Sequence, residues 1–193
     1  MFLQNLEQYE IILASKSPRR QQLLADLGLK FTVQSMDVAE EFPEGLGMTE
    51  IPVFLADLKA EAFRPQLKNN QLVITADTIV WLNGEVLGKP TDYNDGFRML
   101  SGLSGKKHQV ITGVCLLSPE KKVSFYAVTD VWFKHLSDSE IHYYLENYKP
   151  YDKAGAYGIQ EWIGYIGIIR IEGSFFNVMG LPVQSLYEHL KNF

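Results

Sequence analysis

The sequence contains very little cysteine and no long hydrophobic run. Cys115 is the only cysteine in 193 residues, which excludes an intramolecular disulfide framework and any metal site built from several thiolates. No apolar stretch approaches the roughly 18 residues that a membrane-spanning helix needs, and the N-terminal segment lacks the basic start and apolar run of a secretory signal. We therefore expect a cytoplasmic protein, in a reducing compartment, without a membrane partner.

Positive charge is scarce as well. The chain carries 18 Lys and Arg residues against 23 Asp and Glu residues, for a formal net charge of −5. A protein that holds a nucleic-acid backbone through bulk charge has the opposite balance. We expect no nucleic-acid partner, and any cationic binding site has to be a local cluster.

Several common catalytic motifs are absent. The sequence has neither the GxxxxGK[ST] loop of Walker-type NTPases nor a GxGxxG motif after an expected strand, so neither phosphate-binding motif is supported. The histidines show no metal-ligand spacing and lie beside no serine or cysteine nucleophile signature. We assign all four to the surface or to the core: His108, His135, His142 and His189.

The remaining composition is typical of a globular protein. Hydrophobic residues make up 46% of the chain and charged residues 21%. Because no linker or repeat is visible, we expect a single domain over residues 1–193, either one compact body or two lobes that share one core. Expected strands alternate with helices but also form hairpins, for which Asn83-Gly84 is the strongest turn signal. This order predicts a mixed sheet with flanking helices.

Apolar periodicity, together with turn and capping signals, places the individual elements. Ser137 and Glu140 have the spacing of a capping box. Expected helices cover residues 19–27, 49–63, 91–100 and 137–147, and a last helix follows Pro182. Expected strands cover residues 9–14, 30–34, 72–82, 85–87, 107–117, 123–133 and 159–171.

Two adjacent arginines stand at the start of the first expected helix. Ser17 and Pro18 are a natural N-cap and first helical residue, so Arg19 and Arg20 fall in the first turn. The positive end of a helix disfavours each cation by about 0.3–1 kcal/mol. A phosphate there suits the free N–H groups, the guanidinium groups and the hydroxyl of Ser15. The alternative is a solvated arginine pair bridged to a surface carboxylate, and local chemistry leaves both open.

A carboxylate stands inside an apolar strand. Asp77 lies within residues 73–80, which otherwise read as an ordinary buried strand. An ionised carboxylate persists there only if it is hydrogen-bonded, paired, metal-bound or open to a cleft. Alternation puts Thr75 and Asp77 on one face and Thr78 on the other. We interpret Asp77 as a functional residue, and the alternative is a strand-end aspartate that caps a turn.

Other charged residues carry weaker signals. Lys59 lies in an expected amphipathic helix, where a lysine is normally solvated. Lys89 follows an expected strand, a common location of ligand contacts in α/β folds. Glu40 and Glu41 lie in an acidic loop, which usually faces solvent but can supply oxygen ligands to Mg²⁺. None of these residues defines a site alone.

Five motifs occur in a specific order and spacing along nearly the whole chain. They are the run from Ile12 to Arg20, Ala76-Asp77-Thr78, Gly88-Lys89-Pro90, the run from Asp152 to Gln160, and Gly173-Ser174 with the run from Asn177 to Pro182. In this combination the chain resembles the Maf family of nucleoside triphosphate pyrophosphatases, which is related in fold to inosine triphosphate pyrophosphatases. The resemblance implies a mixed, elongated sheet with flanking helices in two lobes around a cleft.

The resemblance also implies an activity and its residues. By it, Asp77 is the proton acceptor that activates water for attack on the α-phosphate of a nucleoside triphosphate, which yields the monophosphate and pyrophosphate. Glu40 and Asp77 help to place a divalent cation, Mg²⁺ or Mn²⁺, and clustered positive charge suits phosphoryl chemistry. The residues implied to hold the triphosphate are Ser15, Arg19, Arg20, Lys59 and Lys89.

Within the family, substrate choice tracks the positions that match Arg19, Thr78 and Gln160, and this combination resembles the branch that hydrolyses dTTP and UTP. The Gln160 amide offers an acceptor and a donor to the imide edge of thymine or uracil. The chain departs from the family pattern at two positions. Glu161 stands where glycine is usual and bears on the loop beside the base, and Lys16 replaces a small residue and adds a cation near the phosphates.

We predict an enzyme that hydrolyses dTTP, UTP or modified pyrimidine nucleotides. One alternative is the same chemistry on 7-methyl-GTP or another purine nucleotide. A second alternative is a non-catalytic nucleotide-binding regulator of cell division, and a third is an α/β protein whose charges are all paired or solvated. We expect a homodimer, the commonest assembly of small soluble enzymes.

Overall fold

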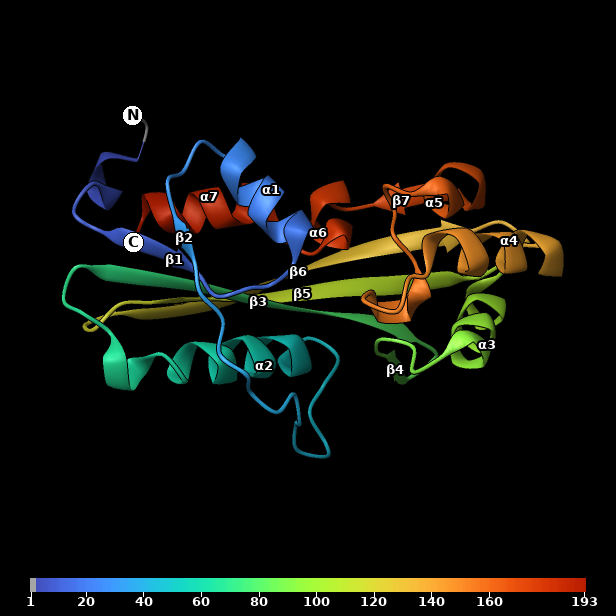
Figure 1. Cartoon of the computed structure of the whole chain (residues 1–193), viewed down its shortest axis with the longest axis horizontal. Coiled ribbons are helices and arrows are strands. Elements are labelled where there is room, and N and C mark those ends of the chain that lie inside the picture. Colours follow the sequence, from blue (N-terminus) through green and yellow to red (C-terminus); the bar gives the residue numbers. More distant parts are fainter. Residues whose placement is uncertain (1–2) are drawn as a thin grey trace. The chain divides into compact units, whose positions relative to one another are not determined.

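The computed structural model describes residues 3–193, along which helices and strands alternate (Figure 1). The strands are β1 (Glu10–Leu13), β2 (Thr32–Val33), β3 (Gln71–Leu82), β4 (Glu85–Leu87), β5 (Lys107–Leu117), β6 (Lys122–Phe133) and β7 (Ile168–Glu172). The helices are α1 (Pro18–Asp26), α2 (Glu50–Glu61), α3 (Tyr93–Leu103), α4 (Asp138–Tyr148), α5 (Trp162–Gly167), α6 (Phe175–Met179) and α7 (Val183–Lys191).

The seven strands of residues 3–193 form one sheet, in the order β2-β1-β3-β5-β6-β7, with β4 paired to β3. β1 is parallel to β2 and to β3, and Ile12 lies opposite Val73. The β3–β4 and β6–β7 pairs are antiparallel. Parallel neighbours need a long connection, here one that contains a helix, whereas a tight hairpin gives an antiparallel pair. The expected mixed α/β fold class is confirmed.

The described residues divide into two compact units. The first contains the residues up to Asp77, Thr112–Ala127 and Gly180–Phe193, and the second contains Thr78–Ile111 and Val128–Met179. β3, β5 and β6 each supply residues to both units, so no linker separates the units in the sequence. The single domain expected over 1–193 stays a prediction.

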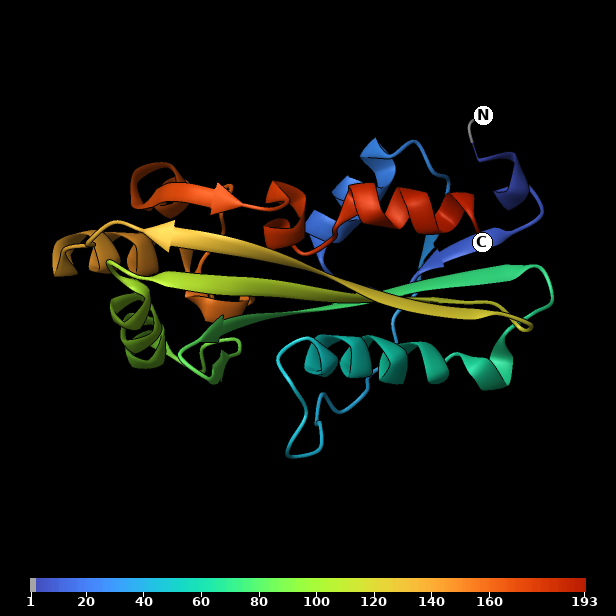
Figure 2. The ribbon, with the colours of Figure 1, turned by 180° about the vertical axis from the view of Figure 1, so that it is seen from behind.

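In the first unit, α2 covers one face of the strands, and α1 and α7 lie on the other (Figures 1 and 2). Gly113 of β5 permits the close approach of α2, because a Cβ there would lie 2.3 Å from the carbonyl of Pro52. Ala56 and Ala60 of α2 are fully buried in this contact region. Cys115 belongs to the same core, where burial raises the pKa of its thiol to about 12. It is a packing residue, as its apolar flanks predict.

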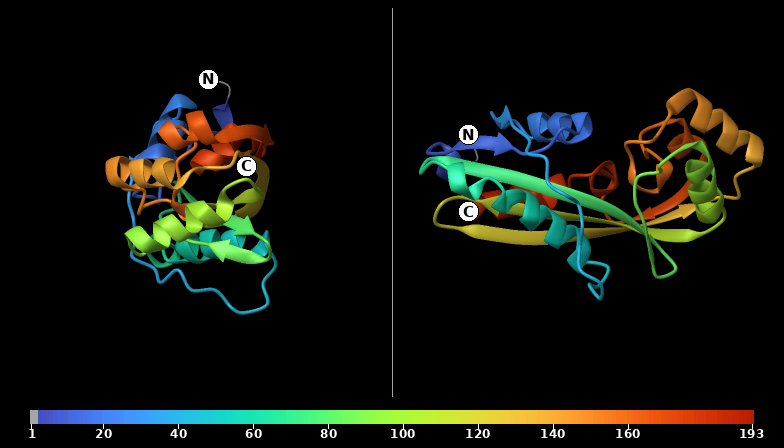
Figure 3. Two further views of the ribbon diagram at one scale, coloured as in Figure 1. Left: turned by 90° about the vertical axis from the view of Figure 1, so that its right-hand side faces the viewer. Right: turned by 60° about the horizontal axis from the view of Figure 1, so that its bottom comes forward.

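In the second unit, α3 and α4 pack against each other (Figure 3). The predicted capping box of α4 forms. The Ser137 hydroxyl accepts a bond from the Glu140 N–H at 3.3 Å, and the Glu140 carboxylate accepts from the Ser137 N–H at 2.8 Å. The predicted β3–β4 hairpin also forms. Its turn residues Asn83 and Gly84 have positive φ angles of 52° and 91°, as a two-residue hairpin turn requires.

The observed helix α3 differs at both ends from the helix expected over 91–100. It begins one residue after Asp92, whose side chain is the N-cap and accepts a bond from the Asp95 N–H at 2.9 Å. The Thr91 N–H instead donates to the Asp95 carboxylate at 3.1 Å. The helix continues to Leu103. An aspartate competes successfully with a threonine at this position because its carboxylate is the stronger acceptor.

The segment 159–171, which we expected to be a strand, contains a helix over 162–167. Only its last residues join β7, and α5 precedes them. Its buried residues Ile159, Ile163 and Gly167 recur every four positions, which is a helical period that the many glycines obscure. The strand expected over 30–34 shortens to β2. α6 has no counterpart among the expected elements.

One histidine is buried in the second unit. His108 is 2% exposed, and its Nε2 lies 2.7 Å from the hydroxyl of Tyr157. The rings of Phe133 and Tyr157 pack edge-on against it. Burial lowers the pKa of His108 to about 4, against the opposing charge of Asp130. The native ring therefore stays neutral at pH values where the unfolded chain, with a pKa of 6.5 at this residue, takes up a proton.

We predict that the free energy of unfolding falls as the pH is lowered from about 6.5 to about 4, because only the unfolded state binds a proton on His108 in this range. The loss is at most on the order of 3 kcal/mol. His108→Gln is expected to remove most of this fall in urea denaturation at a series of pH values. His142→Gln, at an exposed histidine of the same unit, is the control. Equal pH slopes for the two variants would contradict the assignment.

Candidate active site

The loop after β1 leads into α1 with the geometry that the sequence predicts. The Ser17 hydroxyl accepts a bond from the Arg20 N–H at 3.5 Å, and the Ser17 N–H donates to Ser15 Oγ at 3.2 Å. Pro18 is the first helical residue. These bonds hold Arg19 and Arg20 in the first turn of the helix, with the buried hydroxyl of Ser15 just before it.

Arg20 is half-buried, and its Nε donates to the Gly180 carbonyl at 2.7 Å. Burial lowers the pKa of its guanidinium, and the charge of Asp77 opposes this effect. Arg19 lowers the pKa further, and Glu40 raises it. The arginines at the positive end of α1 thus share their surroundings with two carboxylates of the same unit. Arg20 is not the solvated side chain of the alternative interpretation.

Asp77 lies on β3 and faces α2. Asp77 is 8% exposed, and it follows five buried residues of the same strand. Two residues earlier on the same face, the Thr75 hydroxyl donates to the Ala56 carbonyl of α2 at 2.7 Å. The alternation predicted for this strand therefore points the Asp77 carboxylate toward α2. Asp77 is not a strand-end residue capping a turn, because β3 continues to Leu82.

Lys59 supplies the charge that compensates Asp77. It lies almost one turn after Ala56 on α2, and its Nζ is 2.5 Å from Asp77 Oδ1 and 2.8 Å from Glu40 Oε1. The lysine side chain is only 17% exposed. The local interpretation of Lys59 as a solvated residue is therefore wrong. One ammonium group joins a carboxylate of the acidic loop to a carboxylate of the sheet.

The second unit contains the remaining three expected site residues. Thr78 directly follows Asp77 on β3 and is half-buried, whereas Lys89 is exposed in the loop after β4. Gln160 lies in the loop before α5. The Gly155 N–H donates to the Gly88 carbonyl at 3.0 Å, so this loop lies beside the segment that carries Lys89. Two of the five motifs thereby meet within one unit.

Lys153, which is not among the expected site residues, is a buried charge. Its Nζ lies 2.7 Å from Asp152 Oδ1 and 3.1 Å from Glu161 Oε1. The only signal for it in the sequence is its place within the motif from Asp152 to Gln160. Lys16, by contrast, is exposed and pairs with the exposed Asp37 at 2.8 Å.

The carboxylates of the first unit supply only part of the ligand set that a metal ion needs. No group of three or more His, Cys, Asp or Glu side chains within residues 3–193 is placed to hold one. Glu40 and Asp77 nevertheless converge on one cation, the ammonium of Lys59. Mg²⁺ is commonly bound by one or two carboxylates, with substrate oxygens and water completing its shell. The pair therefore fits a substrate-associated divalent cation.

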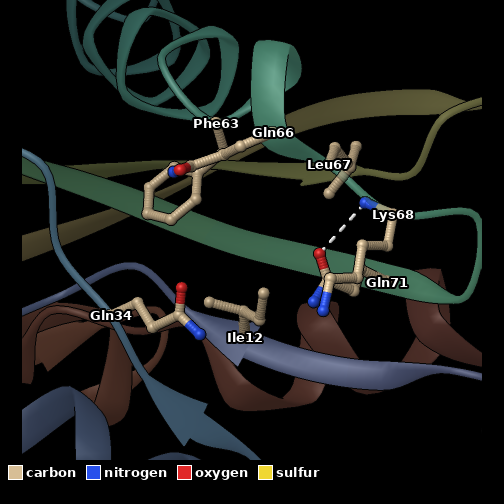
Figure 4. A pocket seen from close by; sticks show the side chains of 7 residues that line it. All are labelled: Ile12, Gln34, Phe63, Gln66, Leu67, Lys68 and Gln71. Carbon is tan, nitrogen blue, oxygen red and sulfur yellow. Dashed lines mark hydrogen bonds between the residues drawn. The ribbon is translucent and has the colours of Figure 1, made fainter.

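A pocket of about 270 Å³ in the first unit contains none of the expected site residues. Figure 4 shows side-chain amides around an apolar floor. Gln71 Oε1 accepts a bond from the Lys68 N–H at 3.1 Å. The pocket offers neither a carboxylate nor clustered cations. Its lining residues are Ile12, Gln34, Phe63, Gln66, Leu67, Lys68 and Gln71.

In the part of the chain that the structure describes, no helix is long and apolar enough to cross a membrane. This agrees with the lack of a long hydrophobic run in the sequence.

Comparisons with known proteins cover nearly the whole chain. The family model described as Maf-like protein matches residues 10–193. A protein of Phocaeicola vulgatus named dTTP/UTP pyrophosphatase is 58% identical over 190 residues, which cover 98% of each chain. A Porphyromonas gingivalis protein of the same name is 54% identical over 194 residues, which cover 99% of this chain and 98% of the other. A solved nucleoside-triphosphatase / dITP/XTP pyrophosphatase from Mycobacterium abscessus is a distant likeness, with 17% identity and a TM-score of 0.44 over 95% of this chain and 97% of that one.

We predict that Lys59→Met destabilises the protein by about 3 kcal/mol or more, because it leaves the buried Asp77 carboxylate without its cation. Lys122→Met is the matched control. Lys122 also pairs with carboxylates of α2, Asp57 at 3.1 Å and Glu61 at 3.3 Å, but its side chain is 38% exposed. Loss of an exposed pair is expected to cost less than about 1 kcal/mol. Urea denaturation at pH 7 measures both, and equal losses would refute the assigned role of Lys59.

Proposed function

Since this chain belongs to the family of Maf-like proteins, we propose that it hydrolyses dTTP and UTP to the nucleoside monophosphate and pyrophosphate. Relatives that carry the name dTTP/UTP pyrophosphatase share more than half of its residues over nearly their full length. The observation that supports the proposal most is the buried Asp77 carboxylate held by Lys59 beside a second carboxylate, Glu40. This arrangement suits the hydrolysis of a phosphoric anhydride.

Attack of water on a phosphorus atom needs a group that takes a proton from the water. We assign this role to Asp77. Its position within a long buried strand gives the carboxylate a fixed place. Lys59 bonds to Oδ1, so we assign the transferred proton to Oδ2. Release of a monophosphate and pyrophosphate requires cleavage between the α- and β-phosphates, and we assign the attack to the α-phosphorus, from which pyrophosphate departs as the leaving group.

The negative charge of a triphosphate has to be neutralised as the bond to the leaving group breaks. We assign this to the helix start at Arg19 and Arg20, because guanidinium groups and the positive end of a helix both suit phosphate oxygens. The buried Ser15 hydroxyl adds a donor. Lys59 and, from the second unit, Lys89 complete the set that we assign to the triphosphate.

A divalent cation, Mg²⁺ or Mn²⁺, belongs to the proposal. Glu40 and Asp77 are the residues that would hold it, since both converge on the Lys59 ammonium, at 2.8 and 2.5 Å. When bound, such a cation neutralises charge on the phosphate oxygens. The protein side chains retain the tasks of orienting the triphosphate and accepting the proton.

Recognition of the base is assigned to the second unit. Gln160 offers an amide to the imide edge of thymine or uracil, and Thr78, with Arg19 of the first unit, is the other proposed determinant of substrate choice. Modified pyrimidine nucleotides with the same edge are further substrates in this proposal. The cytoplasmic location and the homodimer stay predictions.

We expect pyrophosphate release from dTTP and UTP in the presence of Mg²⁺ or Mn²⁺, and loss of this release when a chelator is added, because the carboxylates of Glu40 and Asp77 repel the negative triphosphate when no cation lies between them. The measurement is a panel of dTTP, UTP, CTP, ATP, GTP and 7-methyl-GTP, ranked by kcat/KM. Turnover of 7-methyl-GTP without turnover of dTTP would contradict the proposal and favour the purine alternative. Tight dTTP binding in calorimetry without product would favour a non-catalytic regulator.

A further inference from the structure

Glu161, which stands where the family pattern usually has glycine, ends a tight turn in the second unit. Its N–H donates to the Gly158 carbonyl at 3.0 Å and so encloses Ile159 and Gln160 in the turn. The Tyr165 hydroxyl donates to the Gln160 carbonyl at 2.7 Å. The main chain that carries Gln160 is therefore fixed at two points.

The Glu161 carboxylate is anchored by two buried side chains. Its Oε2 accepts a bond from the Tyr144 hydroxyl, which itself accepts from the Gly158 N–H at 3.0 Å. Its Oε1 lies 3.1 Å from Lys153 Nζ. Tyr144 is fully buried, and the Lys153 side chain is 9% exposed. The carboxylate is thus confined to one place.

The Glu161 carboxylate and the Gln160 amide both lie over Gly158. A Cβ built on this glycine would lie 2.9 Å from Glu161 Oε2 and 3.1 Å from Gln160 Nε2, so the missing side chain leaves room for both groups. A carboxylate accepts hydrogen bonds and carries negative charge. It therefore attracts the NH₂ group of the neighbouring amide and repels the amide oxygen. Gln160 Oε1 is buried and has no hydrogen-bond partner in the protein.

We propose that Glu161 is a specificity-determining positioning residue, whose charge fixes the Gln160 amide so that Oε1 is presented as a vacant acceptor. This inference rests on the proposed function, in which Gln160 meets the base. Thymine and uracil carry a ring N–H that satisfies such an acceptor. Cytosine has a ring nitrogen without hydrogen at the same position and leaves the acceptor unpaired, which costs binding free energy. Glu161 thereby favours dTTP and UTP over CTP.

Glu161→Gln tests this inference, because it removes the charge but keeps the length of the side chain and an oxygen that can accept from Tyr144. The neutral amide no longer distinguishes the two ends of the Gln160 amide. The ratio of kcat/KM for dTTP to that for CTP is expected to fall about tenfold. The change should lie mainly in a higher KM for dTTP, with kcat for dTTP within about threefold of the wild type.

Two further variants separate charge from rigidity. Tyr144→Phe removes the hydroxyl that joins Gly158 to Glu161 but keeps the Glu161 charge beside the amide. It should lower the melting temperature and leave the dTTP to CTP ratio near that of the wild type. Glu172→Gln, at an exposed ion pair with Arg170 in the same unit, is expected to change neither quantity.

The possible results are decisive in both directions. An unchanged ratio in Glu161→Gln, or an equal fall in Tyr144→Phe, overturns the inference, since charge would then not set the preference. An equal loss of kcat/KM for both nucleotides in Glu161→Gln also overturns it, because that pattern indicates structural damage. Failure of the proposed function is visible separately, as a wild-type protein that releases no pyrophosphate from dTTP.

Discussion

The structure depends on a carboxylate placed inside a buried strand. Asp77 follows a run of buried residues on β3, where an unpaired charge is prohibitively costly. The positive charge of Lys59 on α2 compensates the negative charge of Asp77. Lys59 reaches Asp77 because the main chain of α2 packs closely against the sheet at Gly113. The ion pair between Lys59 and Asp77 therefore depends on the close packing of α2. The same pairing brings Glu40 of the acidic loop to the sheet.

The second unit also contains a buried lysine between two carboxylates. Lys153, like Lys59, is a largely buried lysine that contacts two carboxylates, here Asp152 and Glu161. In each unit a lysine fixes a loop against the regular structure beside it. Buried ion pairs of this kind add little net stability but define one arrangement of the groups that they join. Fixed side chains are what phosphoryl transfer and base recognition require, because both depend on preorganised geometry.

Much of the fold follows from local sequence signals. The capping box at Ser137, the turn at Asn83-Gly84 and the helix start at Ser17 all form as predicted, since each depends on neighbours within four residues. The segment 159–171 was misassigned because its buried residues follow a helical period among glycines that suggest a turn or strand. The partners of Lys59 could not be predicted from local chemistry either. They lie 18 and 19 residues away along the chain and meet only through tertiary packing.

The most direct test concerns the Asp77 carboxylate as the acceptor of the proton. Asp77→Asn keeps the shape of the side chain and removes its basicity, so single-turnover hydrolysis of dTTP should slow by about 10²–10⁴-fold. Calorimetry with the same variant should show dTTP binding within about tenfold of the wild type, because the cations around the triphosphate remain. Hydrolysis that stays within about tenfold of the wild-type rate would contradict the assignment of the base.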